Sequence, residues 1–154
     1  MRRKRRYRTA VVPALLLLLA LLAGCRGGEE PQTQEEESGY EIYYLNQTET
    51  GISGTAYEPA GASTGELVEE FLEQLAAVPA DTELKPVLTQ EIMVDGYVVE
   101  NGQLSLDFGI GYQQMTGTRE ILTRMAVVRT MCQIPEVEYV SFLVGSNPLM
   151  DSKE

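Results

Sequence analysis

Histidine and tryptophan are absent from the 154-residue sequence, which contains only two cysteines. Because histidine is the commonest general base and a frequent zinc ligand, its absence argues against serine–histidine catalysis and against zinc sites of the histidine type. Two cysteines are also too few for a multi-cysteine metal site. We therefore expect no catalytic residues, no metal ion and no cofactor.

Basic residues are scarce once the first eight positions are passed. Six of the 12 Lys and Arg residues lie at positions 2–8, whereas all 23 acidic residues follow Gly24. From residue 25 onward the chain has six basic and 23 acidic side chains, a formal charge of −17. Nucleic-acid binding depends largely on Lys and Arg contacts to phosphate, so we predict that nucleic acid is not a partner.

One long apolar run stands behind the basic start, at residues 10–23. It falls short of the about 20 apolar residues that a membrane-spanning helix needs. It fits the apolar segment of a secretory signal peptide, which spans about 7–15 residues, follows a basic segment and ends at small residues. We expect residues 1–24 to be such a peptide.

The end of this run resembles a bacterial lipobox, because Leu22, Ala23 and Gly24 stand directly before Cys25. The resemblance implies cleavage between Gly24 and Cys25 and a diacylglycerol joined by a thioether to Cys25. An ordinary signal peptide with a chance thiol is the alternative. Stable anchoring takes about two acyl chains, which a diacylglyceryl group supplies. We therefore predict an extracytoplasmic protein that is lipid-anchored to the bacterial cell membrane.

Residues 26–38 contain no large apolar side chain and are dominated by Gly, Pro, Gln and Glu. Such a segment cannot bury a core, so we expect it to be disordered. The sequence thus predicts three parts. Residues 1–24 are a lipoprotein signal peptide, residues 25–38 a tether that begins at the lipidated Cys25, and residues 39–154 a folded domain.

The spacing of apolar residues predicts the order of elements in this domain. Strands are expected at residues 40–46, 52–58, 92–99, 103–108 and 137–144. One helix is expected from the capping box of Ser63 and Glu66 to a point before Pro79, and a second at residues 118–133. Asn101-Gly102 predicts a two-residue hairpin turn. The order ββαββαβ favours an α+β fold with a single mixed β-sheet and two helices packed on one face.

The second predicted helix has an apolar face. This face consists of Ile121, Leu122, Met125, Val128 and Cys132. We expect it to enter the core, with Cys132 as a small core residue, because free cysteines are commonly buried. The three arginines of this helix, Arg119, Arg124 and Arg129, are expected to pair with nearby acids, and a partner-facing edge is the alternative.

Five stretches, in order along the chain, resemble the GerMN domain, also described as the sporulation and spore germination domain. They are residues 42–45 (IYYL), 67–79, 102–108 (GQLSLDF), 127–135 and 136–149. Thr130 and Pro135 stand in register with the family's pattern in the fourth stretch. Family members often continue beyond the turn at Pro148, whereas this chain ends at Glu154, which leaves open a domain that is incomplete at its C-terminus.

The resemblance implies an extracytoplasmic, non-catalytic binding or assembly module linked to sporulation and spore germination. In endospore formers such domains act at the channel complex that joins the mother cell and the forespore. The implied partners are envelope or sporulation-channel proteins, besides the membrane that holds Cys25. A similarity to the ring-building folds of secretion machines is also implied.

Two other functions remain open from the sequence. A ligand-binding envelope lipoprotein would hold a small solute or a peptidoglycan fragment, and the GIGYQQ segment with Tyr112 is the candidate for its site. A glycan hydrolase would need two carboxyl groups across a sugar-binding cleft. Its candidates are Asp95, Glu100 and Asp107.

Overall fold

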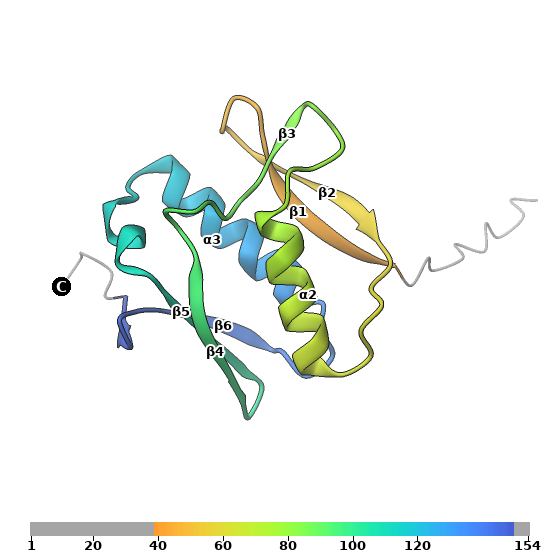
Figure 1. Cartoon of the computed structure of the whole chain (residues 1–154), viewed down its shortest axis with the longest axis vertical. Helices are drawn as coiled ribbons and strands as arrows, with labels where there is room; N and C mark the ends of the chain where they lie inside the picture. Colours follow the sequence, from red (N-terminus) through yellow and green to blue (C-terminus); the bar gives the residue numbers. More distant parts are fainter. Residues whose placement is uncertain (1–38, 150–154) are drawn as a thin grey trace, which may run out of the picture. The chain divides into compact units, whose positions relative to one another are not determined.

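The structure, a computed structural model, describes residues 39–149 (Figure 1). The predicted signal peptide, Cys25 and the tether lie outside the described residues. The elements follow the order β1 (Tyr40–Asn46), β2 (Ile52–Tyr57), α2 (Thr64–Ala76), β3 (Leu84–Lys85), β4 (Val94–Glu100), β5 (Gln103–Phe108), the 3₁₀-helix η1 (Ile110–Gln114), α3 (Thr118–Met131), β6 (Tyr139–Val144) and β7 (Asn147–Pro148).

The predicted α+β class is confirmed, but the prediction of a single sheet is wrong. The strands form two sheets, one in the order β2-β1-β3 and one in the order β4-β5-β6-β7. Strands β5 and β6 are parallel, and the other neighbours are antiparallel. Helix α3 contacts β1 in the first sheet and β6 in the second, and α2 contacts both β1 and α3 (Figure 1).

Strand β3 covers only one end of the second edge of β1, and side chains from α3 and the residues after it bond to that edge further along. Only Leu45 and Asn46 of β1 pair with β3. Further along the same edge, the N–H of Tyr43 donates to Oγ1 of Thr130, and the N–H of Glu41 donates to Oε1 of Gln133. A strand edge whose N–H groups are already bonded cannot accept another strand there.

Helix α2 begins as predicted. The hydroxyl of Ser63 accepts a hydrogen bond from the N–H of Glu66 at 3.3 Å, and the carboxylate of Glu66 accepts one from the N–H of Ser63 at 2.9 Å. This is the reciprocal capping box. Four apolar side chains of the helix are buried on one side: Leu67, Val68, Phe71 and Leu75.

The hairpin of β4 and β5 is also confirmed. Asn101 and Gly102 have φ angles of 51° and 81°, the two positive values that a type I′ turn requires. Beyond the turn, Leu104, Leu106 and Phe108 alternate with less buried residues and are fully buried. They share one core with buried residues of β1, α2 and α3.

The predicted core face of α3 is largely wrong. The buried residues of the helix are Leu122, Thr123, Ala126, Val127, Thr130 and Met131. Ile121 and Met125 are 61% and 42% exposed, and Cys132 is exposed as well. The helix carries apolar residues on nearly all sides, so their spacing alone does not identify the buried face. Among residues 39–149, no helix combines the length and the apolarity needed to cross a bilayer.

Strand β6 is shorter than the strand predicted at residues 137–144, and most of its residues are only partly buried. It lies between β5 and β7 in its sheet, but only Val144 of its six residues is buried. The short β7 reaches just two of these residues, through the pairs Leu143 with Pro148 and Val144 with Asn147. The apolar run at residues 137–144 therefore does not produce a strand buried on both faces.

Candidate functional site

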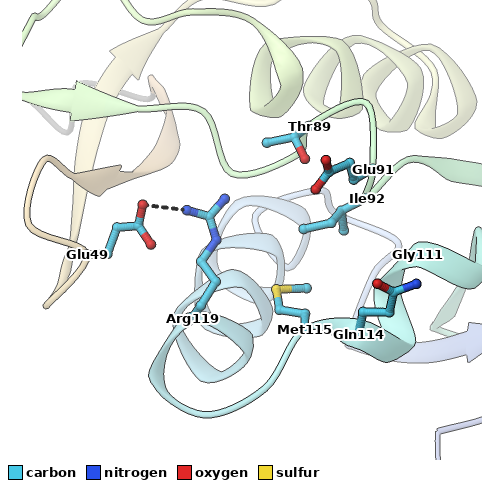
Figure 2. A pocket seen from close by; sticks show the side chains of 8 residues that line it. All are labelled: Glu49, Thr89, Glu91, Ile92, Gly111, Gln114, Met115 and Arg119. Carbon is cyan, nitrogen blue, oxygen red and sulfur yellow. Dashed lines mark ion pairs between the residues drawn. The ribbon is translucent and has the colours of Figure 1, made fainter.

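A pocket with a volume of about 720 Å³ lies where the β1–β2 turn, the segment before β4, η1 and the start of α3 meet (Figure 2). Its lining consists of Glu49, Thr89, Glu91, Ile92, Gly111, Gln114, Met115 and Arg119. A smaller hollow of about 350 Å³ lies beside β2, between residues 46–48, 53–55 and 81–84. The larger pocket falls within the range typical of small-molecule sites, about 300–1,000 Å³.

Gly111 allows η1 to close one side of this pocket. A Cβ atom at this position would lie 2.0 Å from the carbonyl oxygen of Glu91, so only glycine permits the approach of the two backbones. The next residue, Tyr112, anchors η1 in the core. It is buried, with its ring centroid 4.6 Å from that of Phe108.

The prediction that the GIGYQQ segment could line a ligand site agrees with the pocket only in part. Gly111 and Gln114 of this segment line it, but Tyr112 does not. The hydroxyl of Tyr112 instead accepts a hydrogen bond from Nε of Arg124 at 3.2 Å. The prediction thus located the segment, whereas Tyr112, the side chain named as the candidate for the ligand, belongs to the core.

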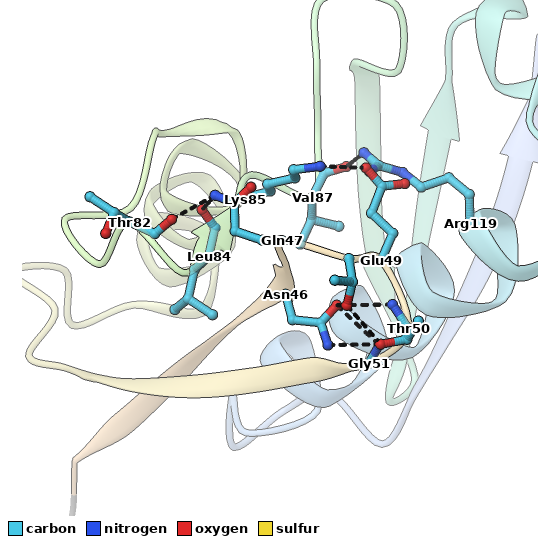
Figure 3. A network of polar contacts seen from close by, with 11 residues as sticks. Asn46, Gln47, Glu49, Thr50, Gly51, Thr82, Leu84, Lys85, Val87 and Arg119 are labelled. Carbon is cyan, nitrogen blue, oxygen red and sulfur yellow. Dashed lines mark hydrogen bonds and ion pairs between the residues drawn. The ribbon is translucent and has the colours of Figure 1, made fainter.

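Glu49 and Arg119, which line one side of the pocket, form a charged triad with Lys85, which lies outside the lining (Figure 3). Oε1 of Glu49 lies 3.2 Å from Nζ of Lys85 and 3.1 Å from Nη1 of Arg119. Nη2 of Arg119 also donates to the carbonyl oxygen of Val87 at 3.3 Å. Partial burial acts to raise the pKa of Glu49, but the hydrogen bonds and charges of Lys85 and Arg119 outweigh it and hold the pKa below its ordinary value.

The backbone of Glu49 is strained in order to reach this position. Its φ angle is 53°, in the left-handed region that non-glycine residues seldom adopt. The β1–β2 turn holds it there, because the N–H of Glu49 donates to the carbonyl oxygen of Asn46 and the side chain of Asn46 accepts from the N–H of Thr50. Asn101 and Ser146 have positive φ angles as well, so this conformation reflects the tight turn that places Glu49 beside Arg119.

The opposite side of the pocket carries an unpaired carboxylate. The exposed carboxylate of Glu91 makes no hydrogen bond or ion pair with any described residue. Figure 2 shows Glu91 and Gln114 across the pocket from Glu49 and Arg119. Ile92, which is buried, and the half-buried Met115 supply apolar surface to the lining. The sequence did not reveal this arrangement of charges, because Glu49, Lys85, Glu91 and Arg119 belong to four separate segments.

The three candidate acids of a glycan hydrolase line neither of the two pockets. Asp107 accepts hydrogen bonds from the N–H and the hydroxyl of Ser146, at 2.9 and 2.8 Å, and these bonds lower its pKa. It therefore holds the β6–β7 turn. Asp95 occupies the bulge between Val94 and Gly96, whereas Glu100 lies at the other end of the hairpin.

The arginines of α3 pair with acids in two cases out of three. Arg119 contacts Glu49, and Nη2 of Arg124 lies 2.6 Å from Oε1 of Glu120. Arg129 instead lies over the ring of Tyr43, 5.0 Å from its centroid. Within residues 39–149, no group of three or more acidic or cysteine side chains is placed to hold a metal ion.

Comparisons with known proteins agree with this fold. The Germane family, described as sporulation and spore germination, matches residues 41–150. The tandem GerMN domains of the sporulation protein GerM from Bacillus subtilis superpose with a TM-score of 0.59 at 14% identity, over 72% of this chain and 40% of the GerM chain. The first GerMN domain of GerM alone gives 0.58 at 15% identity, over 72% of this chain and 85% of that domain.

The chain therefore spans less than half of the tandem GerM structure, and it aligns with most of a single GerMN domain. No curated protein sequence matches it. At these identities the structural likeness establishes the fold, and the family match covers most of the chain. The chain belongs to the Germane family of sporulation and spore germination and carries a GerMN domain that resembles those of GerM.

Proposed function

We propose that this protein is a lipid-anchored, extracytoplasmic and non-catalytic binding module that takes part in sporulation and spore germination. The observation that carries the proposal is the Germane match over residues 41–150, together with the GerMN fold of the described residues. The lipobox resemblance at residues 22–25 supports the anchor. Envelope or sporulation-channel proteins are the partners that such a module would bring to the membrane.

The anchor is tested by replacing each of the two cysteines in turn. Cys25→Ala should release the protein from the membrane fraction and abolish incorporation of an alkyne-labelled fatty acid. Cys132→Ala is the matched control, since Cys132 is an exposed thiol on α3, and it should change neither readout. Fatty-acid label retained by Cys25→Ala would contradict the anchor.

The link to sporulation is tested by deleting the gene in its own host and counting heat-resistant spores and germinated spores. We expect the deletion to lower the number of heat-resistant spores or of germinated spores. The wild-type gene should restore the number, and the Cys25→Ala gene should not. A deletion strain that sporulates and germinates like its parent would contradict the proposed role.

A second function, a ligand-binding lipoprotein of the envelope, is favoured by the pocket of about 720 Å³. Its lining combines three charged side chains and the neutral polar Thr89 and Gln114 with the apolar side chains of Ile92 and Met115. Thermal shift measurements with soluble cell-wall fragments test this function. A rise in Tm with ligand concentration supports it, because a ligand that binds only the folded state stabilises that state.

A further inference from the structure

We infer, on the basis of the second function proposed above, that the pocket formed by Glu49, Glu91, Arg119 and their neighbours binds a small zwitterion. Its carboxylate pairs with Arg119, its ammonium pairs with Glu91, and its aliphatic side chain contacts Ile92 and Met115. Free amino acids and short peptides have this chemistry.

The triad of Glu49, Lys85 and Arg119 carries one positive charge in excess, although Lys85 itself lies outside the pocket lining. Lys85 and Arg119 are both cationic, and a single carboxylate, that of Glu49, serves both of them. Arg119 has five N–H donors, and the contacts to Glu49 and Val87 leave donors over for a ligand. Its side chain is 23% exposed and so is accessible from the pocket. A planar guanidinium binds a carboxylate through two parallel hydrogen bonds.

Glu91 supplies the matching negative charge. Its carboxylate has no partner among residues 39–149, whereas Glu49 is shared between two cations. An ammonium group bound here would gain a charge-assisted hydrogen bond that the protein itself does not provide. The amide of Gln114 and the hydroxyl of Thr89 lie in the same lining and add neutral donors and acceptors.

The space between the two charged sides suits an aliphatic group. Ile92 and Met115 contribute apolar surface to the lining. Methionine adapts to ligands of different shape because its side chain is unbranched and flexible. The pocket therefore selects mainly for the two charges and less strictly for the group between them.

The backbone on both sides of the pocket is held in place before a ligand arrives. The contact of Gly111 with the carbonyl oxygen of Glu91 sets the backbone on one side. The turn that holds Glu49 at a positive φ angle sets the other, through hydrogen bonds to Asn46. Such preorganisation reduces the ordering cost of binding.

The test uses the full chain in detergent micelles and follows the amide NMR signals of Gly111 and Arg119. The probes are leucine, leucyl-leucine, N-acetyl-leucyl-leucine and leucyl-leucinamide. Leucine or leucyl-leucine should shift both signals in a saturable way, and the tighter of the two identifies the source as a free amino acid or a peptide. Each blocked peptide lacks one charge and should bind at least about tenfold more weakly than leucyl-leucine.

Two variants show where the probes bind. Glu91→Gln should weaken binding of the better zwitterion at least about tenfold. Because Glu91 is exposed and makes no bond among the described residues, this variant should keep the fold. Glu100→Gln is the matched control on the exposed hairpin end, outside the pocket, and should bind like the wild type.

Equal binding of the zwitterion and both blocked peptides would overturn the inferred ligand class and leave a ligand-binding pocket in place. Unchanged binding by Glu91→Gln would overturn the assigned site. If no probe shifts either signal at concentrations up to about 10 mM, well above the 1 mM range of weak binding, the inferred class is again overturned. A rise in Tm with cell-wall fragments would then support the ligand-binding function, even though the ligand is not a small zwitterion.

Discussion

The hydroxyl of Thr130 accepts a hydrogen bond from the backbone N–H of Tyr43 at 3.1 Å, and so a helix side chain takes the place of a neighbouring strand. Gln133 does the same two residues earlier on β1. It accepts from the N–H of Glu41 at 2.8 Å and donates to the carbonyl oxygen of Glu41 at 2.7 Å. These contacts join α3 to β1 and help to explain why the fold has two sheets rather than one.

Replacing Thr130 by Val should destabilise the domain by about 1–3 kcal/mol, because the partly buried N–H of Tyr43 would lose its partner. Thr123→Val is a matched control on the same helix. Thr123 is also fully buried, but its hydroxyl has no hydrogen-bond partner among the described residues. Removing an unsatisfied hydroxyl should be neutral or stabilising. Urea unfolding of the two variants measures the difference, and equal losses would refute the proposed role of Thr130.

The two faces of α3 should respond differently to truncation. Leu122 is 6% exposed and Met125 42% exposed. Leu122→Ala should therefore cost about 2–5 kcal/mol of unfolding free energy, and Met125→Ala less than about 1 kcal/mol. The same urea titrations give both values. A larger loss for Met125→Ala than for Leu122→Ala would contradict the burial of Leu122 and the exposure of Met125.

Gly111 should tolerate no side chain. In Gly111→Ala the new Cβ would meet the carbonyl oxygen of Glu91 at 2.0 Å, so the backbone must shift. Overpacking of this kind costs about 1–3 kcal/mol. Gly96→Ala is the matched control, since a Cβ atom there has nothing within 4 Å. Thermal unfolding should show a lower Tm for Gly111→Ala only. Similar Tm values for the two variants would contradict the close approach of η1 to Glu91.

The bond between Tyr57 and Glu70 should make stability depend on alkaline pH. The hydroxyl of Tyr57 donates to Glu70, whose carboxylate also accepts from the N–H groups of Ala60 and Gly61. The hydrogen bond to Glu70, followed by burial, raises the pKa of Tyr57 to about 12. In the unfolded chain the pKa of tyrosine is about 10.

Because the folded state favours the protonated hydroxyl, this stabilisation is fully present below about pH 10 and is lost as the pH rises toward about 12. The variant Tyr57→Phe lacks the bond at every pH. The difference in unfolding free energy between the two proteins should be about 1 kcal/mol at pH 8 and should vanish near pH 12. A difference that stays constant over this range would show that the hydroxyl does not titrate as described.

Local signals in the sequence predicted the helices and strands well, but they did not predict which strands become neighbours. The capping box of Ser63 and the turn at Asn101 act within a few residues, so the chain itself determines them. Which strands become neighbours depends on Thr130 and Gln133, side chains about 90 positions from the strand they contact. Their hydrogen bonds leave no periodic trace in the sequence.

The candidate site was less predictable than the fold. The GIGYQQ segment was found by its glycines, but the charges that define the pocket lie at Glu49, Glu91 and Arg119. None of these residues belongs to a local motif. Each looks like an ordinary surface charge in an acidic chain, and only the fold brings them to one pocket.

We propose above that a lipid-anchored GerMN domain acts by contact with other proteins of sporulating cells. The most direct measurement is a crosslinking pull-down of the intact protein from membranes of sporulating and vegetative cells, with Cys25→Ala as the control. We predict capture of envelope or channel proteins from sporulating membranes only, and its loss in the control. Capture of the same proteins at both stages, or of none at either stage, would contradict the claim.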